Sequence, residues 1–103
     1  MEAAVGHIVV SLAGRDKERP FYVLKTEDNF VYLADGKLRK LEACKRKNRR
    51  HVRVVSDEIT IVSEKLRSGK EVLNSEMRKA LSVYLKTRSQ AEGDMKALKK
   101  GLM

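Results

Sequence analysis

The sequence predicts a mainly β protein with a C-terminal α-helical part, in which a small five-stranded barrel precedes a helical tail. Short apolar, β-branched runs recur about every ten residues up to Val55 and are separated by hairpin turns, a pattern typical of small closed barrels. Beyond Asn74 the apolar residues recur at helical spacing instead. The chain of 103 residues has room for one domain and an appendage, with a modest core.

The expected strands occupy the N-terminal half. An apolar run that stops at Ala13-Gly14 is followed by a charged loop, and a second run begins at Pro20. Because proline has no N–H, it suits the first residue of a strand. Asp35-Gly36 is a strong hairpin signal ahead of the fourth run. The five expected strands lie at residues 8–12, 20–24, 30–33, 37–41 and 51–55.

The C-terminal half is expected to be helical. Residues 58–62 suit either an extended segment or the start of a short helix that ends at Ser68-Gly69. The clearest helix covers residues 75–88, with Asn74 or Ser75 as its N-cap. One face of this helix carries an apolar stripe that should pack on the barrel. The stripe consists of Met77, Ala80, Leu81, Tyr84 and Leu85.

These elements predict three parts. Residues 5–55 form the barrel domain, and residues 56–90 form a helical C-terminal extension. The last segment, residues 91–103, is too short to hold a helix without packing, because isolated helices of fewer than about 12 residues are marginal. We expect it to be frayed.

The run from Lys37 to Arg53, KLRKLEACKRKNRRHVR, dominates the charge of the chain. It holds nine of the 23 Lys and Arg residues and a single acid, Glu42, so it contributes +8 to a net charge of +9. Such a concentrated cationic field is expected where a protein meets a polyanion, because neutralised phosphates release condensed counterions. A solvated face or a flexible basic tail is the alternative, but the leucines and valines within the run favour a folded segment.

The composition favours a reducing, cytoplasmic environment without membrane contact. The single cysteine, Cys44, precludes an intramolecular disulfide. No apolar run approaches the roughly 20 residues that cross a bilayer. Residues 1–12 also lack the basic start of a signal peptide.

Residue types that carry catalysis or bind metals are not arranged for either purpose. The two histidines and Cys44 lack the paired spacing of a zinc site. No serine, threonine or cysteine lies near a histidine in a recognisable catalytic pattern, and no glycine-rich phosphate loop is present. We therefore expect neither an enzyme nor a bound cofactor or metal.

Residues 5–23, VGHIVVSLAGRDKERPFYV, resemble a KOW motif. Gly6 precedes an apolar strand, Gly14 follows it, and a charged loop leads to a second apolar strand. We expect Gly14 to adopt a positive φ where this loop begins. Where many KOW motifs have glycine in the loop, this chain has Glu18 and Arg19, followed by Pro20.

Two later features extend this resemblance. The Asp35-Gly36 turn follows about twenty residues on, and the basic run closes in NRRHV at residues 48–52. In this order, the features are similar to the fourteenth eukaryotic-type family of large-subunit ribosomal proteins and its small bacterial relatives. The resemblance covers residues 5–55, and residues 56–103 have no counterpart that we can place in the ribosomal family.

The resemblance implies a barrel of the Src-homology-three type in a ribosome-associated RNA-binding protein. Such a protein would contact folded ribosomal RNA of the large subunit through basic loops, with ribosomal proteins as candidate partners of the C-terminal helix. Two basic loops at one end of the barrel would form a single phosphate-binding face. Arginine suits such a face, since its planar guanidinium can donate two hydrogen bonds to one phosphate. The candidate RNA-binding residues are Arg15, Lys17, Arg19, Lys45, Arg46, Lys47, Asn48, Arg49, Arg50 and His51.

Some of these residues have structural alternatives. Asn48 suits a turn cap as well as an RNA contact, and His51 suits packing at a strand start better than hydrogen bonding to RNA. Asp35-Gly36 is expected to be a turn and nothing more. The five aromatic residues fall in strand or helix patterns, where most should be core. Recognition of folded RNA by shape is therefore favoured over base stacking.

Two other functions compete with ribosomal RNA binding. One is a protein-interaction KOW module of the transcription or translation machinery, with the helical tail as its docking element. The other is a nonspecific nucleic-acid binder, since the basic run would serve any polyanion. The charge favours a nucleic-acid partner over a protein partner, and the ribosomal-type pattern favours RNA over generic binding.

Overall fold

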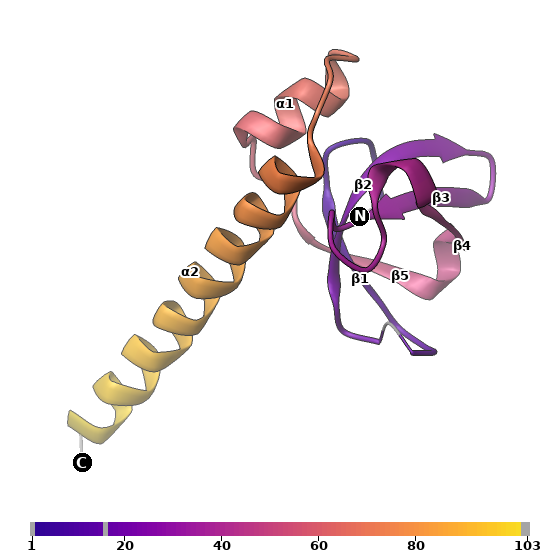
Figure 1. Ribbon diagram of the computed structural model, residues 1–103. Helices are drawn as coiled ribbons and strands as arrows, with labels where there is room; N and C mark the ends of the chain where they lie inside the picture. Colours follow the sequence, from indigo (N-terminus) through magenta and orange to yellow (C-terminus); the bar gives the residue numbers. More distant parts are fainter. Residues whose placement is uncertain (1, 16, 102–103) are drawn as a thin grey trace.

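The computed structural model describes the backbone of residues 2–15 and 17–101, and the side chains as far as Arg88. A five-stranded antiparallel sheet is followed by two α-helices, which confirms the prediction of a mainly β protein with a C-terminal helical part (Figure 1). The strands are β1 (Ile8–Ser11), β2 (Pro20–Glu27), β3 (Phe30–Ala34), β4 (Lys45–Asn48) and β5 (Val52–Ser56). The helices are the 3₁₀ turns η1 (Leu41–Ala43) and η2 (Arg49–His51) and the α-helices α1 (Ile61–Arg67) and α2 (Asn74–Gly101).

The strands lie in the order β4-β3-β2-β1-β5, and each neighbouring pair is antiparallel. β4 and β5 are therefore the edges, and within the described residues no β4–β5 ladder closes the sheet into a barrel. A side chain spans part of this gap. The Lys47 Nζ, on β4, donates a hydrogen bond to the carbonyl of Ala13, just beyond β1, at 3.1 Å. The sheet thus curls enough for β4 to approach the end of β1.

Each face of the sheet carries a buried apolar cluster. Because successive strand side chains point to opposite faces, Ile8 and Val9 enter different clusters, as do Phe21 and Tyr22. The inner cluster, made by the strands and the N-terminal segment, consists of Ala3, Val9, Phe21, Val23, Val31 and Leu33. The outer cluster, made with the helices, consists of Ile8, Tyr22, Ala34, Val62, Val72, Met77 and Leu81. This burial on both sides explains why β1 has a continuous apolar run and not an alternating pattern.

The apolar stripe of α2 packs on the sheet, as predicted. Met77 and Leu81 are buried in the outer cluster, and Ala80 and Tyr84 pack against it. Leu85 is the exception, because it remains 45% exposed. Beyond these contacts α2 runs away from the sheet (Figure 1).

The strand expected at residues 37–41 is wrong. Its place is taken by a turn in which the Asp35 Oδ1 accepts hydrogen bonds from the amides of Lys37 and Arg39, both at 2.9 Å. These bonds satisfy the backbone groups that a strand ladder would otherwise use. The fourth strand is β4, which begins at Lys45 and therefore lies in the run that was expected to be a basic loop.

The Asp35-Gly36 turn is also more than a turn, because α2 docks on it. Gly36 has φ +77°, and a Cβ at this position would lie 2.3 Å from the carbonyl oxygen of Asn74. On the next turn of the helix, the Arg78 Nη1 donates to the Gly36 carbonyl at 3.0 Å. Only glycine permits this close approach of the turn to the start of α2.

The start of α1 is fixed by Thr60. The Thr60 Oγ1 accepts from the amide of Ser63 at 3.0 Å, and the Ser63 Oγ accepts from the amide of Thr60 at 2.6 Å. This reciprocal capping box places the first helical residue at Ile61. Of the two structures predicted for residues 58–62, an extended segment or the start of a helix, the structure has the start of a helix.

The N-cap predicted for α2 is wrong. The Asn74 Oδ1 accepts from the amide of Leu41 at 2.8 Å, so this side chain joins the helix to η1 instead. The Glu76 Oε1 reaches back and accepts from the amide of Leu73 at 3.2 Å. A tertiary contact has thus taken the side chain that the local sequence suggested as a cap.

α2 is longer than predicted. Its backbone continues through Gly93 to Gly101, so the helix does not end near residue 90. We predicted that residues 91–103 would be frayed. The structure describes only the backbone of residues 91–101, and residues 102 and 103 lie outside the described part of the chain.

Candidate nucleic-acid interface

The two basic segments singled out by the sequence lie next to each other. The amide of Leu12, at the start of the β1–β2 loop, donates to the carbonyl of His51 at 2.9 Å. The Lys47 Nζ donates to the carbonyl of Ala13 in the same loop. Four exposed cationic or histidine side chains project from these joined segments. This basic face consists of Arg15, Lys17, Arg50 and His51.

Strand alternation divides the basic run between two faces of the sheet. Lys45 and Lys47 pair with the inner-cluster residues Leu33 and Val31 of β3, so they lie on the inner face. Arg46 and Asn48 pair with Tyr32 and Phe30 and lie on the outer face. The basic run therefore does not form a single cationic loop, because its charges point in two directions.

Lys47 has a structural role. Its ammonium donates to Ser11 Oγ as well as to the carbonyl of Ala13, and the Ser11 side chain is fully buried. The Ser11 hydroxyl in turn donates to the same Ala13 carbonyl at 2.8 Å. Lys47 thus holds the β1–β2 loop against β4, and positions the basic face without being part of it.

Arg49 is likewise committed to the fold. Its Nε donates to the carbonyl of Asp28 at 2.7 Å, and its Nη1 donates to the carbonyl of Ala3 at 2.9 Å. The same nitrogen lies 3.3 Å from a Glu2 carboxylate oxygen. Arg49 therefore ties the N-terminal segment to the β2–β3 turn.

The remaining residues of this segment differ in role. The Asn48 Oδ1 accepts from the amide of Arg50 at 3.0 Å, so Asn48 does cap the turn. His51 is exposed within η2, so the packing role favoured for it is wrong. Lys45 is half-buried on the inner face. Among the candidate RNA-binding residues between 45 and 51, the exposed ones are Arg46, Arg50 and His51.

The β1–β2 loop has a left-handed backbone at two positions, only one of which is a glycine. Gly14 has φ +84°, as predicted, and Glu18 has φ +65°. The amide of Glu18 donates to the carbonyl of Ser11 at 2.8 Å, which holds the loop in this conformation. A left-handed backbone costs a residue other than glycine about 1–2 kcal/mol. The loop therefore has, at Glu18, the backbone conformation for which glycine is suited.

Arg19 lies apart from the basic face. Its Nη2 is 3.9 Å from a carboxylate oxygen of Asp35. With Lys37 and Arg78 it lines a cavity of about 600 Å³ beside α2. The structure thus brings Arg15 and Lys17 to the face shared with η2, whereas Arg19 belongs to the junction between the sheet and the helix.

A second cluster, of aromatic and cationic side chains, was not predicted from the sequence. Phe30 and Tyr32 are partly exposed on the outer face of β3. The Arg46 guanidinium carbon lies 4.5 Å from the centre of the Phe30 ring, and the Lys25 Nζ lies 5.4 Å from that of Tyr32. We call Lys25, Phe30, Tyr32 and Arg46 the hairpin platform. The alternation of these aromatics with Val31 and Leu33 was the signal that could have found it.

A hydrogen bond orders one side of the platform. The Tyr32 hydroxyl donates to the Glu27 Oε2 at 2.5 Å. This bond lowers the pKa of the Glu27 carboxyl, with a further contribution from the charge of Lys25. The same bond raises the pKa of the Tyr32 hydroxyl.

Other kinds of site are not supported by the described residues. Within the described residues, no three His, Cys, Asp or Glu side chains form a group that could hold a metal ion. None of the helices in the described part of the chain is both long enough and apolar enough to cross a membrane. Comparison with known proteins finds no family model that matches the chain and no curated protein that matches it. The function is therefore inferred from the site itself.

Proposed function

We propose that the protein binds RNA through the basic face. The observation that carries this proposal is the contact between its two basic segments, through the bonds from Leu12 to His51 and from Lys47 to Ala13. These bonds hold Arg15 and Arg50 on neighbouring segments of a folded scaffold. Cations at fixed separation suit the regularly spaced phosphates of a folded nucleic acid.

The resemblance to large-subunit ribosomal proteins makes ribosomal RNA the favoured ligand, in a cytoplasmic, ribosome-associated protein. Two features support the KOW part of this proposal. The loop after β1 has positive φ at Gly14 and at Glu18. In addition, β5 returns to pair with β1 while Lys47 links β4 to the loop beyond β1, which supports a curled sheet of the Src-homology-three type.

A protein-interaction module is the second candidate, and one observation favours it. Ile61 and Val83 are 74% and 56% exposed, and they line one shallow pocket between α1 and α2. Exposed apolar side chains that gather at one place suit a protein partner. In a ribosome-associated protein, this surface of the helical extension is where a ribosomal protein would dock.

The RNA proposal is tested with two variants of equal charge. The face variant changes Arg15, Lys17 and Arg50 to Gln. The control variant makes three lysine-to-glutamine changes at exposed positions elsewhere. The control positions are Lys70, Lys79 and Lys86.

Binding of each variant to a large-subunit ribosomal RNA fragment is measured over a range of salt concentrations. If the three face residues contact phosphates, the face variant should lose affinity, and its slope of log K against log salt should shrink by about 2–3. The control should stay close to the original protein. Equal losses in both variants would mean that only net charge matters, and an unchanged face variant would refute the assignment of the face.

A further inference from the structure

We propose that the hairpin platform binds an unpaired nucleotide of RNA by stacking on its base. The proposal rests on the proposed function, because η2 of the basic face adjoins the β2–β3 turn, where the Arg49 amide donates to the Asn29 carbonyl at 2.8 Å. It adds a second mode of contact, in which a planar base lies against Phe30 and Arg46 while phosphates approach Lys25. Base stacking of this kind is sequence-tolerant, since every base has a π-face.

The platform is exposed because the helices cover only part of the outer face. Tyr22 of β2 and Ala34 of β3 are buried under α1 and α2. The β2–β3 register then shifts between Val23 and Lys25, and the outer face continues with the platform. Figure 1 shows the β2–β3 hairpin extending away from the two helices. The sheet thus leaves an aromatic surface uncovered beside its helix-covered half.

Cross-strand pairing brings the platform together. Tyr32 on β3 pairs with Lys25 of β2 on one side and with Arg46 of β4 on the other. Arg46 then lies diagonally over Phe30, with its guanidinium carbon 4.5 Å from the ring centre. A planar guanidinium over an aromatic ring offers a flat surface on which a base can stack, and its charge suits the attached phosphate.

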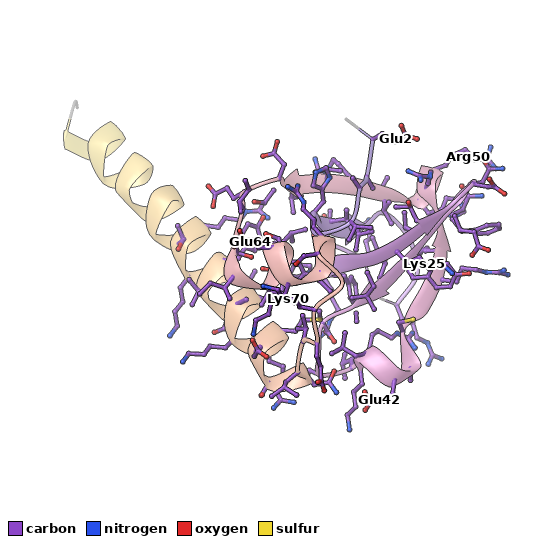
Figure 2. All side chains as sticks on the ribbon, turned by 90° about the horizontal axis from the view of Figure 1, so that it is seen from above. Glu2, Lys25, Glu42, Arg50, Glu64 and Lys70 are labelled. Carbon is purple, nitrogen blue, oxygen red and sulfur yellow. The ribbon has the colours of Figure 1, made fainter. Side chains whose placement is uncertain are left out.

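The charges around the platform also favour an anionic ligand. Lys25 and Arg46 contribute two positive charges, and Glu27 contributes one negative charge that is already bonded to the Tyr32 hydroxyl. Figure 2 shows Lys25 and Arg50 at the end of the domain opposite the free end of α2. β4 leads directly into η2, so the outward Arg46 precedes the exposed Arg50 by four residues. RNA held at the basic face therefore has the platform beside it.

The test uses a short single-stranded uridine RNA that carries a central 2-aminopurine, and a duplex RNA of the same length. Two variants change the platform. Phe30→Leu removes the aromatic ring but keeps an apolar side chain, and Arg46→Lys keeps the charge but removes the planar guanidinium. Tyr84→Leu is the matched control, because Tyr84 is another partly buried aromatic residue, on α2 and away from the platform.

Stacking predicts that the 2-aminopurine fluorescence of the single strand is quenched on binding the original protein. Phe30→Leu should weaken single-strand binding at least about fivefold, which corresponds to about 1 kcal/mol, the lower end for one stacked base. Arg46→Lys should weaken it as well, while leaving the salt dependence unchanged. Duplex binding and the Tyr84→Leu control should be unaffected.

Several outcomes would overturn the platform and leave the proposed function standing. Single-strand affinity that is unchanged in both Phe30→Leu and Arg46→Lys would mean that the contact between Arg46 and Phe30 stabilises the hairpin and does not bind a base. Equal losses for duplex and single strand would exclude stacking as the cause. If Phe30→Leu is unfolded by circular dichroism, the exposed Arg46→Lys variant decides the question. If neither RNA binds the original protein while the large-subunit ribosomal RNA fragment does, the platform is rejected and the proposed function stands.

Discussion

The docking of α2 on the Asp35-Gly36 turn can be tested with two glycine-to-alanine changes that differ in one respect. Gly36 and Gly14 have similar backbone conformations, with φ +77° and +84°. A Cβ on Gly36 would lie 2.3 Å from the carbonyl oxygen of Asn74, whereas a Cβ on Gly14 would meet nothing within 4 Å. The two variants therefore share the backbone strain, and only Gly36→Ala pushes the helix away.

The expected magnitudes follow from this difference. A left-handed alanine costs about 1–2 kcal/mol, and the stiffer unfolded chain returns about 0.4–1 kcal/mol of it. Gly14→Ala should therefore destabilise the protein by about 0.5–1 kcal/mol. Overpacking against backbone adds about 1–3 kcal/mol, so Gly36→Ala should cost about 1.5–4 kcal/mol in total.

The assay is urea unfolding followed by far-ultraviolet circular dichroism. With slopes of about 1–3 kcal/mol per molar urea, Gly36→Ala should lower the midpoint by on the order of 1–2 M, and Gly14→Ala by clearly less. Gly36→Ala should also release the bond between the Arg78 guanidinium and the Gly36 carbonyl. Equal midpoints for the two variants would refute the close approach of the turn to α2.

Three further changes test individual contacts. Glu18→Gly should stabilise the protein by about 0.5–1 kcal/mol in urea unfolding, because it relieves the left-handed strain. Glu18→Ala removes the side chain beyond Cβ but keeps that strain, so it should not stabilise the protein. Lys47→Met should cost about 1 kcal/mol, because the bonds to Ser11 and Ala13 are lost, and an unchanged midpoint would show that this tether is dispensable. The bond from the Lys65 ammonium lowers the pKa of the Glu76 carboxyl below its ordinary 4.5. This pair therefore stabilises the fold at neutral pH, and the stabilisation is lost as the pH falls through the lowered pKa. Glu76→Gln should therefore flatten the acid side of the stability profile, and an unaltered profile would remove the pair from the explanation.

Local patterns in the sequence were sufficient for part of the fold. The apolar runs around Val9, Val23 and Val31 identify three strands, because burial on both faces leaves a continuous apolar signal. The stripe from Met77 to Tyr84 identifies the helix face that packs on the sheet. Both signals depend on neighbouring residues alone.

The elements that were missed depend on partners far along the chain. Residues 37–41 follow the Asp35-Gly36 hairpin signal, which predicted a strand, but the Asn74 side chain accepts a hydrogen bond from the amide of Leu41, 33 residues away. β4 is an edge strand made of Lys, Arg and Asn, and such edges carry charge without an apolar pattern. No local rule shows that Lys47 reaches Ser11.

For the candidate site, the sequence indicated the basic segments but not the role of each cation in them. The charge run and the charged loop at residues 15–19 were both singled out from the sequence, and the structure joins them through the bond from the Leu12 amide to the His51 carbonyl. The charge pattern could not separate the exposed cations from those committed to the fold, because cations of both kinds look alike in a sequence. It also could not show that the outer face beside Arg46 is left uncovered by the helices.

The most direct test of the central claim is co-sedimentation of the protein with purified large ribosomal subunits at about physiological salt. Excess duplex DNA and free ribosomal RNA are added separately as competitors. If the basic face recognises folded RNA, the protein should stay with the subunits in the presence of DNA and be displaced by ribosomal RNA. Displacement by DNA as readily as by ribosomal RNA would contradict the claim, because counterion release alone would then account for the binding.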